Sequence, residues 1–562
     1  MMRLKRLDLA LATALAATAI PAEAVQDSAR KAPPEATAGE CAAPAASAPA
    51  AKAEPAIPPP VLVKGLGYAG IKPDTDNAEA ERWFRQGVRL IWAYDEVEAV
   101  RSFEQAQKLD PDCAMCAWGE AWARGPTLNL QPRTEEFAKA SAAAKRAVSL
   151  SGKLGERDRA LVEAMRLRTS GDGKFDNEGY RGAMAKLAER FPGEDAVLVM
   201  AADSQIIVDS RTRKLKEGVD AQRWLEQVLK RNPRHSGAIH LYIHLTDFID
   251  RQDLAERHAD RLGWIAPSAS HLVHMPSHTF YGVGRYKDAA AVNVLALAVD
   301  KRYERKVAPP ASAYRTGLYR HNNHFAIESA LMRGDGKTAL LMADNFRERF
   351  PSEEPGFGAI IRAATWYAYG LHADPAAMLR MAEPDQKNVV ARLVRHYARG
   401  EALARAGDSK GVKGEAASMA ALLAGPDGRA LSSKQLQAFL PMMQKVLEGR
   451  AAMMEKRFAD AATVYREGMV LQGQAGFGSD PPPFWYSVRR SLGAALLASG
   501  DAAGARLQFQ ETLKEWPNDP LALYGLSRAE DALGQKRAAA SRLNRAKRIW
   551  AGQVEAVPLA RI

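Results

Sequence analysis

The apolar and small residues of this chain recur with a period of 34 positions. Within residues 80–113 they occupy the fourth, eighth, twentieth, twenty-fourth, twenty-seventh and thirty-second places, as Trp83, Gly87, Ala99, Phe103, Ala106 and Pro111. Spacings of three and four residues place side chains on one face of a helix. Pro111 ends the second segment because proline has no N–H to continue a helix. The pattern predicts a unit of two helices that pack through small and large residues.

The same register returns along most of the chain. Residues 236–269 carry Ala255, Leu262 and Pro267 in place, the unit from 270 carries Ala289 and Ala296, and the pattern resumes near 320 with Ala339 and Pro351. Weaker matches fill 115–233 and 355–470, and a last series comprises Gly493, Ala505, Phe509, Pro517, Ala539, Leu543 and Ala546. This period and these places resemble the tetratricopeptide repeat. The resemblance implies an all-α protein, a right-handed α-solenoid of tetratricopeptide-like helix-turn-helix repeats over residues 61–556.

Length and composition agree with a repeat array. The chain has 562 residues, far more than one hydrophobic core accommodates, and aromatic residues make up only 7% of it. No run of alternating β-branched residues stands between turn signals, so no strand is expected.

The first residues predict export. Arg3, Lys5 and Arg6 precede an apolar stretch over 9–20, and Ala22-Glu23-Ala24 forms a small-residue cleavage site. We therefore expect a signal peptide over 1–24 with cleavage after Ala24, an Ala/Pro-rich disordered linker over 25–60, and a periplasmic or secreted protein. The apolar stretch is shorter than the ~20 residues of a membrane span, and no later segment qualifies.

Charge and cysteine usage exclude some functions. The net charge of +12 is spread over mixed-charge stretches, without a basic block interleaved with aromatics, so no nucleic-acid partner is expected. Cys113 and Cys116 form a CxxC that, in an oxidising compartment, either closes a small disulfide or takes part in thiol exchange. Cys41, in the linker, lacks the context of a lipid-modified cysteine.

Seven of the eleven histidines fall between residues 240 and 324, at related places of the repeat. In tetratricopeptide repeats the first helix of each unit lines the concave groove, chiefly through places two, five, nine, twelve and thirteen. The histidines take places two, five or nine of three consecutive units: His240, His244, His271, His274, His278, His321 and His324. We expect them to converge in the groove and to bind one or two transition-metal ions. The other four, His235, His258, His372 and His396, are expected to face solvent or a peptide.

The ligand type limits the metal and the chemistry. Neutral imidazole suits zinc, copper, iron or nickel, and an added carboxylate favours zinc or non-haem iron. Asp247 and Glu328 also reach groove places, so each is a candidate to activate a metal-bound water, to ligate the metal or to orient a ligand. Leu241 occupies the place of the general-base glutamate in the HExxH zinc-protease motif, which excludes that mechanism. A metal-dependent hydrolase, an oxidoreductase and a metal carrier all stay open.

Two features complicate the arrangement. Pro276 lies within the helix expected to carry His271, His274 and His278; it forces a kink, or the helix restarts there and only His278 keeps its direction. Residues 301–319, with Pro309-Pro310 at their centre, interrupt the His-rich central repeats 236–350 and are expected to form an inserted loop, either a lid or a tolerated insertion.

The alternative function is a scaffold. Tetratricopeptide arrays usually bind protein segments in this groove, and histidine, arginine and tyrosine supply polar contacts to an extended peptide. A protein or peptide ligand without a metal therefore stands beside the metal hypothesis.

Overall fold

The computed structural model describes residues 57–132, 134–212, 219–352, 357–476 and 481–562. The described residues form α-helices and short 3₁₀ helices and contain no β-strand, as the sequence predicts. Within these ranges no helix has both the length and the apolar composition that crossing a membrane requires. The predicted signal peptide and most of the predicted linker lie outside the described residues.

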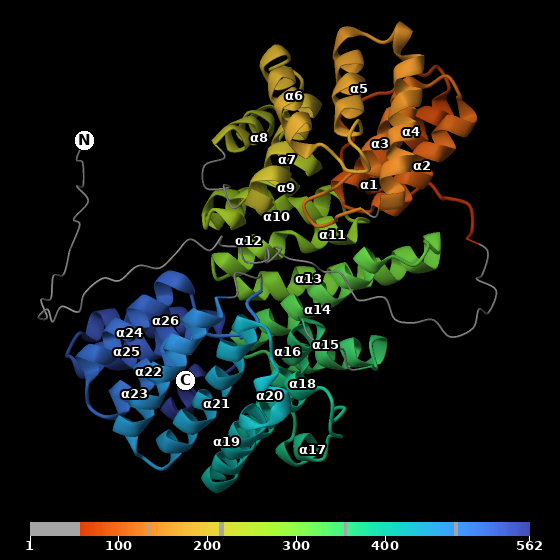
Figure 1. Cartoon of the computed structure of the whole chain (residues 1–562). Helices are drawn as coiled ribbons and strands as arrows, with labels where there is room; N and C mark the ends of the chain where they lie inside the picture. The colour runs from red at the N-terminus through yellow and green to blue at the C-terminus, as the bar shows by residue number, and fades with distance from the viewer. Residues whose placement is uncertain (1–56, 133, 213–218, 353–356, 477–480) are drawn as a thin grey trace, which may run out of the picture. The chain divides into compact units, whose positions relative to one another are not determined.

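The helices follow one another in antiparallel pairs (Figure 1). The first part of the chain contains α1 (Ala78–Trp92), α2 (Glu96–Leu109), α3 (Ala114–Ala123), α4 (Thr134–Leu150), η1 (Ser151–Lys153), α5 (Glu156–Arg168), α6 (Asn177–Arg190), α7 (Asp195–Thr212) and α8 (Val219–Arg231). The central part contains α9 (Ser236–Phe248), η3 (Gln252–Ala255), α10 (Glu256–Ile265), α11 (Ser270–His274), α12 (Pro276–Gly282), α13 (Tyr286–Val307), α14 (Ala313–Met332), α15 (Gly336–Arg349), α16 (Phe357–His372) and α17 (Pro375–Leu379). The last part contains α18 (Val389–Arg405), α19 (Ser409–Ala424), α20 (Pro426–Arg429), α21 (Lys434–Met454), α22 (Phe458–Ala475), α23 (Val488–Ala498), α24 (Ala502–Glu515), α25 (Pro520–Ala532), α26 (Lys536–Ile549), η4 (Val554–Ala556) and η5 (Leu559–Arg561).

The predicted packing of small residues against aromatic rings is present inside the pairs. A Cβ built on Gly87 of α1 would lie 2.6 Å from Cζ of Phe103 on α2, and Gly119 of α3 faces the same ring. At the other end, Phe509 of α24 lies between Gly493 of α23 and Gly525 of α25 in the same way. One ring thus fills the space between three successive helices, which confirms the tetratricopeptide-like repeat and the all-α solenoid class.

The prediction of an inserted loop over 301–319 is wrong for most of that range. Helix α13 continues to Val307 and α14 begins at Ala313, so only residues 308–312 are non-helical. The helix continues because Tyr303 and Val307, four residues apart, are both buried on one face. It ends at Ala308, which adopts φ 43° before Pro309, since a residue before proline disfavours the right-handed helical region.

Pro276 divides its helix without turning the histidines away. It occupies the first position of α12, and Met275 before it keeps helical angles of φ −49° and ψ −36°. His271 and His274 are therefore helical residues of α11, and His274 contacts His278 across the break, while His271 lies with His240 and His244. The alternative in which the first two histidines belong to a turn is wrong.

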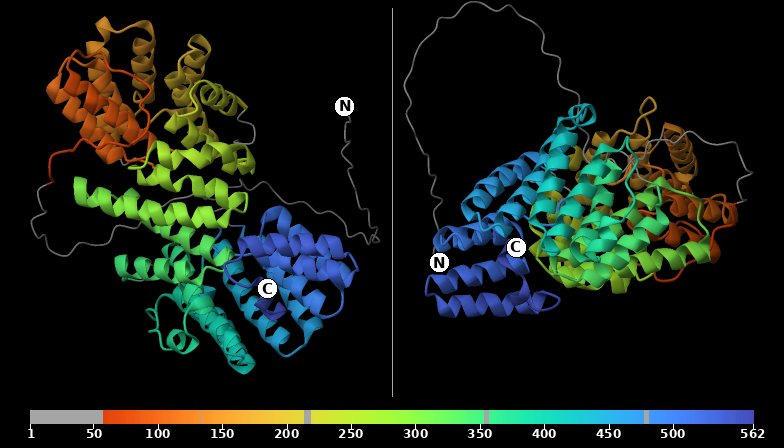
Figure 2. Two further views of the ribbon diagram at one scale, coloured as in Figure 1. Left: turned by 180° about the vertical axis from the view of Figure 1, so that it is seen from behind. Right: turned by 90° about the horizontal axis from the view of Figure 1, so that it is seen from below.

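Contacts distant in sequence join both ends of the array to the central helices. In the non-helical segment before α1, the Gly65 carbonyl accepts a hydrogen bond from Ser268 N at 2.9 Å, and Tyr68 N donates one to Ser236 Oγ at 2.9 Å. From the last repeats, Asn518 Nδ2 donates to the Val283 carbonyl at 3.0 Å. The central helices α13 and α14, which contact each other, are drawn in green in both views of Figure 2. These contacts place the ends of the array around the histidine helices.

Cys113 and Cys116 form a disulfide at the start of α3, and both residues are fully buried. Asp74 accepts hydrogen bonds from Ala114 N and Met115 N at the same helix end, at 3.1 and 2.8 Å. Of the two alternatives for this CxxC, burial favours the structural disulfide, because thiol exchange requires access to a sulfur atom.

We predict that Gly87→Ala lowers the free energy of unfolding by about 1–3 kcal/mol, because its methyl group overlaps the Phe103 ring. Gly182→Ala is the matched control in α6, where no atom lies within 4 Å of the added carbon. It is expected to raise stability by up to about 1 kcal/mol through helix propensity. Urea unfolding followed by circular dichroism measures both. Equal effects of the two substitutions would contradict the interlocked packing.

Candidate metal centre

Four helices bring six of the seven predicted histidines together in two groups. The first triad is His240 and His244 of α9 with His271 of α11, and the second triad is His274 of α11, His278 of α12 and His321 of α14. Within each triad, one ring nitrogen from each residue lies within 4.8 Å of the others. His324 belongs to neither triad.

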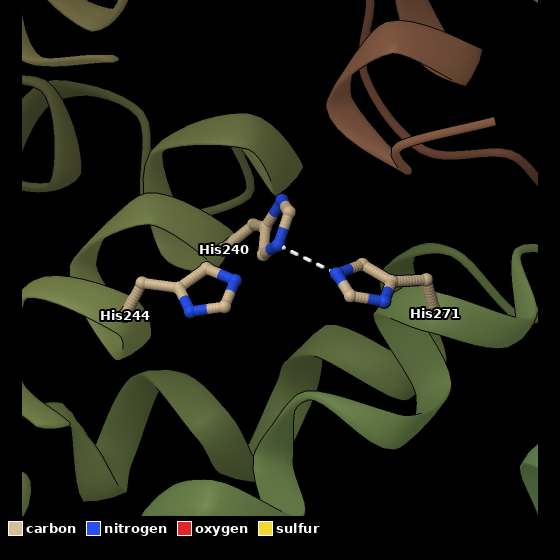
Figure 3. A group of neighbouring side chains, drawn as sticks. All are labelled: His240, His244 and His271. Atoms are coloured by element: carbon tan, nitrogen blue, oxygen red, sulfur yellow. Dashed lines mark hydrogen bonds between the residues drawn. The ribbon is translucent and has the colours of Figure 1, made fainter. Parts of the chain in front are cut away.

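The first triad is held from behind by the end of α1. His240 Nδ1 lies 2.7 Å from the Trp92 carbonyl oxygen, so this nitrogen carries the proton and Nε2 carries a lone pair. His271 Nε2 lies 2.9 Å from His240 Nε2 (Figure 3). His244 lies beside them on α9, and its buried Nε2 makes no hydrogen bond within the described part of the chain.

Tyr94 packs against the first triad from the turn after α1. Its ring centroid lies 4.5 Å from that of His240 and 5.3 Å from that of His271. Tyr94 adopts φ 53°, a left-handed conformation that is costly for a bulky residue. The next residue, Asp95, pairs with Arg315 of α14 at 3.1 Å. This turn therefore connects the first triad to the helix that carries His321.

The second triad is oriented by two side chains. His274 Nδ1 lies 2.7 Å from Asn293 Oδ1, whose amide nitrogen donates to the Ala289 carbonyl, so the oxygen must face the histidine. His278 Nδ1 lies 3.3 Å from Asp247 Oδ2. Both histidines therefore carry their proton on Nδ1 and a lone pair on Nε2.

The three Nε2 atoms of the second triad point at one another. His274 Nε2 and His278 Nε2 are 3.0 Å apart, and His321 Nε2 is 3.5 Å from His278 Nε2. With the proton of each ring on Nδ1, the contact between His274 Nε2 and His278 Nε2 brings two lone pairs together instead of a donor and an acceptor. Such a pair is repulsive unless a cation lies among the nitrogens.

Burial keeps these imidazoles neutral. It lowers the pKa of His240 to about 3, against the weaker opposing effect of the Trp92 carbonyl. Burial, followed by the neighbouring histidines, lowers the pKa of His244, His271 and His321 well below the ordinary value. Neutral imidazole is the form that binds metals, so the ring nitrogens are available as ligands at neutral pH.

The two candidate carboxylates occupy different positions. Asp247 lies beside the second triad, accepting from Gln252 Nε2 at 3.0 Å as well as facing His278. Glu328 is fully buried, and its Oε1 lies 3.2 Å from His324 Nε2 without the alignment of a hydrogen bond. Burial raises the pKa of Glu328, and His324 opposes this rise. Glu328 and His324 thus form a pair of their own on α14.

Both triads border one cavity of about 940 Å³. On one side the lining includes two histidines of each triad and Asp247: His244, His271, His278, His321 and Asp247. The lining that comes from the last repeats includes the apolar side chains Phe439, Met442, Met469, Phe484 and Trp516 and the charged side chains Arg489 and Glu515. His240 and His274, which are fully buried, lie behind the cavity-lining histidines. Residues 308–312 of the expected lid line a different, smaller cavity.

The triads adjoin each other. The ring centroids of His244 and His278 are 5.8 Å apart, and those of His271 and His274 are 5.9 Å apart. Each pair joins one residue of the first triad to one of the second.

Several features of the site were not expected from the sequence. His235 and His258 are buried, so the expectation that they face solvent or a peptide is wrong; His235 accepts from Ala238 N and caps α9. The sequence pattern also does not predict that Trp92, Tyr94 and Asn293 contact the histidines. One signal for Asn293 exists, because it stands at the twenty-fourth place of its unit, where Phe103 and Phe509 stand in theirs. A polar residue at a core place indicates a buried polar partner.

No family model matches the chain, and no curated protein matches it. Among solved structures, a human IFIT1 dimer with m7Gppp-AAAA is similar at 14% identity, covering 84% of this chain and 91% of that one, with a TM-score of 0.29. The APC/C hetero-tetramer Cut9-Hcn1 is similar at 14% identity over 84% of this chain and 81% of that one, also with a TM-score of 0.29. The P58(IPK) TPR domain is 12% identical over 82% and 99%, with a TM-score of 0.21. At these scores the repeat assignment rests on the packing within this chain.

We predict that His235→Asn reduces the acid sensitivity of the fold. Burial lowers the pKa of His235 to about 4, so below its ordinary value of 6.5 the unfolded chain binds a proton there and the folded chain does not. Stability is therefore lost as the pH falls, by ~1.4 kcal/mol per pH unit for this residue. Asparagine also caps a helix but does not titrate.

The measurement is urea unfolding at pH 7 and pH 5 with a chelator present. The wild type should lose ~2 kcal/mol more than His235→Asn between these pH values. Identical losses would show that His235 is protonated to the same extent in both states.

Proposed function

We propose that this protein binds two transition-metal ions, one in each histidine triad. The observation that carries the proposal is the contact between His274 Nε2 and His278 Nε2, which lie 3.0 Å apart while Asn293 and Asp247 contact the Nδ1 atom on the far side of each ring. With both protons on Nδ1, two lone pairs meet at this contact. A cation bound by both nitrogens turns this repulsion into attraction. Two nitrogens on one tetrahedral zinc ion lie about 3.3 Å apart, close to the spacing of these atoms.

The surroundings of the ligands support the same proposal. Metal-ligating histidines characteristically donate their second N–H to a carboxylate, an amide or a backbone carbonyl, which fixes the tautomer. Asp247, Asn293 and the Trp92 carbonyl have these roles for His278, His274 and His240. We accordingly assign Asp247 as a positioning residue of the second triad.

Each triad has the composition of an open site. Three protein ligands leave one position for water or substrate, as in catalytic zinc sites, and two ligands of each triad border the shared cavity. We propose a metal-dependent enzyme, hydrolytic or oxidative, with zinc, copper or iron as candidate ions. Glu328, paired with His324, is the proposed proton acceptor on α14.

Export belongs to the same proposal. The disulfide between Cys113 and Cys116 is of a kind that persists in oxidising compartments, and it supports a periplasmic or secreted location for a chain with the predicted signal peptide.

A scaffold that binds a protein or peptide is the second candidate. The observation in its favour is the size and lining of the cavity, since about 940 Å³ with an aromatic wall and the Arg489 guanidinium can accommodate a peptide segment. A scaffold requires no metal, so metal content distinguishes the two candidates.

We predict that the untagged protein contains two metal ions per chain after incubation with zinc, copper or iron and gel filtration. His240→Ala/His271→Ala and His274→Ala/His278→Ala should each retain one ion, and His396→Ala, outside both triads, should retain two. Mass spectrometry of the metals gives the count, and circular dichroism confirms that each variant is helical. Folded wild type without metal would refute the proposal and leave the scaffold.

We further predict that Asn293→Ala weakens binding of one of the two ions by about 10- to 100-fold, because His274 loses the partner that fixes its tautomer. The matched control is Asn345→Ala on α15. This substitution removes the side chain that accepts a hydrogen bond from the Tyr319 hydroxyl. Competition with a chromophoric chelator measures both affinities. Equal metal affinities in the two variants would show that Asn293 does not contribute to metal binding.

A further inference from the structure

The ligand set of the two triads is uniform. All six side chains are imidazoles, and neither triad includes a carboxylate or a thiolate. The Asp247 carboxylate contacts Nδ1 of His278, on the side of the ring away from the triad, and acts as its positioning partner. Six neutral ligands therefore cancel none of the charge of any bound ions, and the Asp247 carboxylate behind His278 offsets at most one unit of it.

This charge is placed in a buried region. Five of the six histidines are at most 7% exposed. Two dications would place a charge of about four there, and the cost of burying an ion rises with the square of its charge. Monovalent ions reduce the cost per ion to about a quarter. Copper(I) is the monovalent ion that imidazole binds well, and it accepts three ligands.

Both ions would face the same space. His244 and His271 of the first triad and His278 and His321 of the second border one cavity, and rings of different triads approach to 5.8 Å. A small molecule in this cavity therefore reaches both ions at once. Dioxygen is small and apolar, and the side chains of Phe439, Phe484 and Trp516 offer it an apolar surface in this cavity beside Arg489.

We propose that the two triads hold a pair of copper(I) ions that binds and reduces dioxygen in this cavity. The inference rests on the proposed two-metal site and specifies its metal and its ligand. Each copper(I) loses one electron and becomes copper(II), and because dioxygen beside the ions takes up both electrons, the total charge in the site stays at two until protons arrive from solvent. Dioxygen gains the two electrons and takes two protons from solvent; its O–O bond stays intact, two O–H bonds form, and hydrogen peroxide is released. Two neighbouring ions make this a single two-electron step.

The test uses the full chain, freed of metal and loaded with copper(I) under argon. After mixing with air-saturated buffer, an oxygen electrode should record one dioxygen consumed for every two copper ions. Catalase added afterwards should return about half of the consumed dioxygen, because two peroxide molecules yield one dioxygen. The zinc-loaded protein should consume none.

Variants distinguish two copper ions that act together from copper ions that react independently. His274→Ala/His278→Ala, loaded with copper, should slow dioxygen uptake by at least about tenfold, since one ion supplies only one electron. His321→Ala removes a single ligand at the cavity and serves if the double variant does not fold; it should slow uptake in the same direction. His396→Ala should behave as wild type. Uptake that is unchanged in both triad variants would overturn the proposal.

Metal binding and dioxygen consumption are measured separately, so they can fail separately. If the chain binds no metal, the proposed function itself fails. If it binds two ions of zinc or copper but the copper-loaded protein does not consume dioxygen, the two-metal site stands and only the copper and dioxygen proposal is overturned.

Discussion

The contact between a glycine and an indole determines how closely the first histidine helix approaches the end of α1. A Cβ on Gly237 would lie 2.6 Å from Cδ2 of Trp92, so α9 packs here with backbone against ring. At this distance the Trp92 carbonyl reaches His240 Nδ1. The repeat uses the same device elsewhere, with Gly87 and Phe103 as the example nearest the N-terminus. Helix spacing set by small residues is thus a condition for the convergence of the histidines.

The second triad depends on hydrogen bonds that act on the far side of the rings. Asn293 and Asp247 each accept a hydrogen bond from an Nδ1–H group, and this directs two lone pairs toward one point. Without these partners either imidazole can change its tautomer and form an ordinary hydrogen bond to the other. The side chains that do not touch the centre therefore decide whether it favours a cation or a proton.

Burial and the cavity act together at this centre. Burial disfavours protonated imidazoles, so the histidines stay neutral at neutral pH, while the cavity gives small molecules access to four of them. The last repeats contribute further lining of the cavity, and hydrogen bonds such as that from Asn518 to the Val283 carbonyl hold them against the central helices. The cavity is therefore lined both by the helices that carry the histidines and by the last repeats.

The sequence by itself determined the helical class, the repeat period and the helices that carry the histidines, because small, large and proline residues at fixed places encode helix packing locally. It also predicted that all seven histidines converge, and six of them do, since equivalent places in adjacent repeats face the same side. Only the tertiary structure decided that they divide into two triads and that His324 pairs with Glu328 instead. Those outcomes depend on Trp92, Tyr94 and Asn293, whose positions follow from contacts between segments far apart in the chain. The extent of the predicted loop was likewise decided by burial of Tyr303 and Val307, which a pattern of prolines and charges does not reveal.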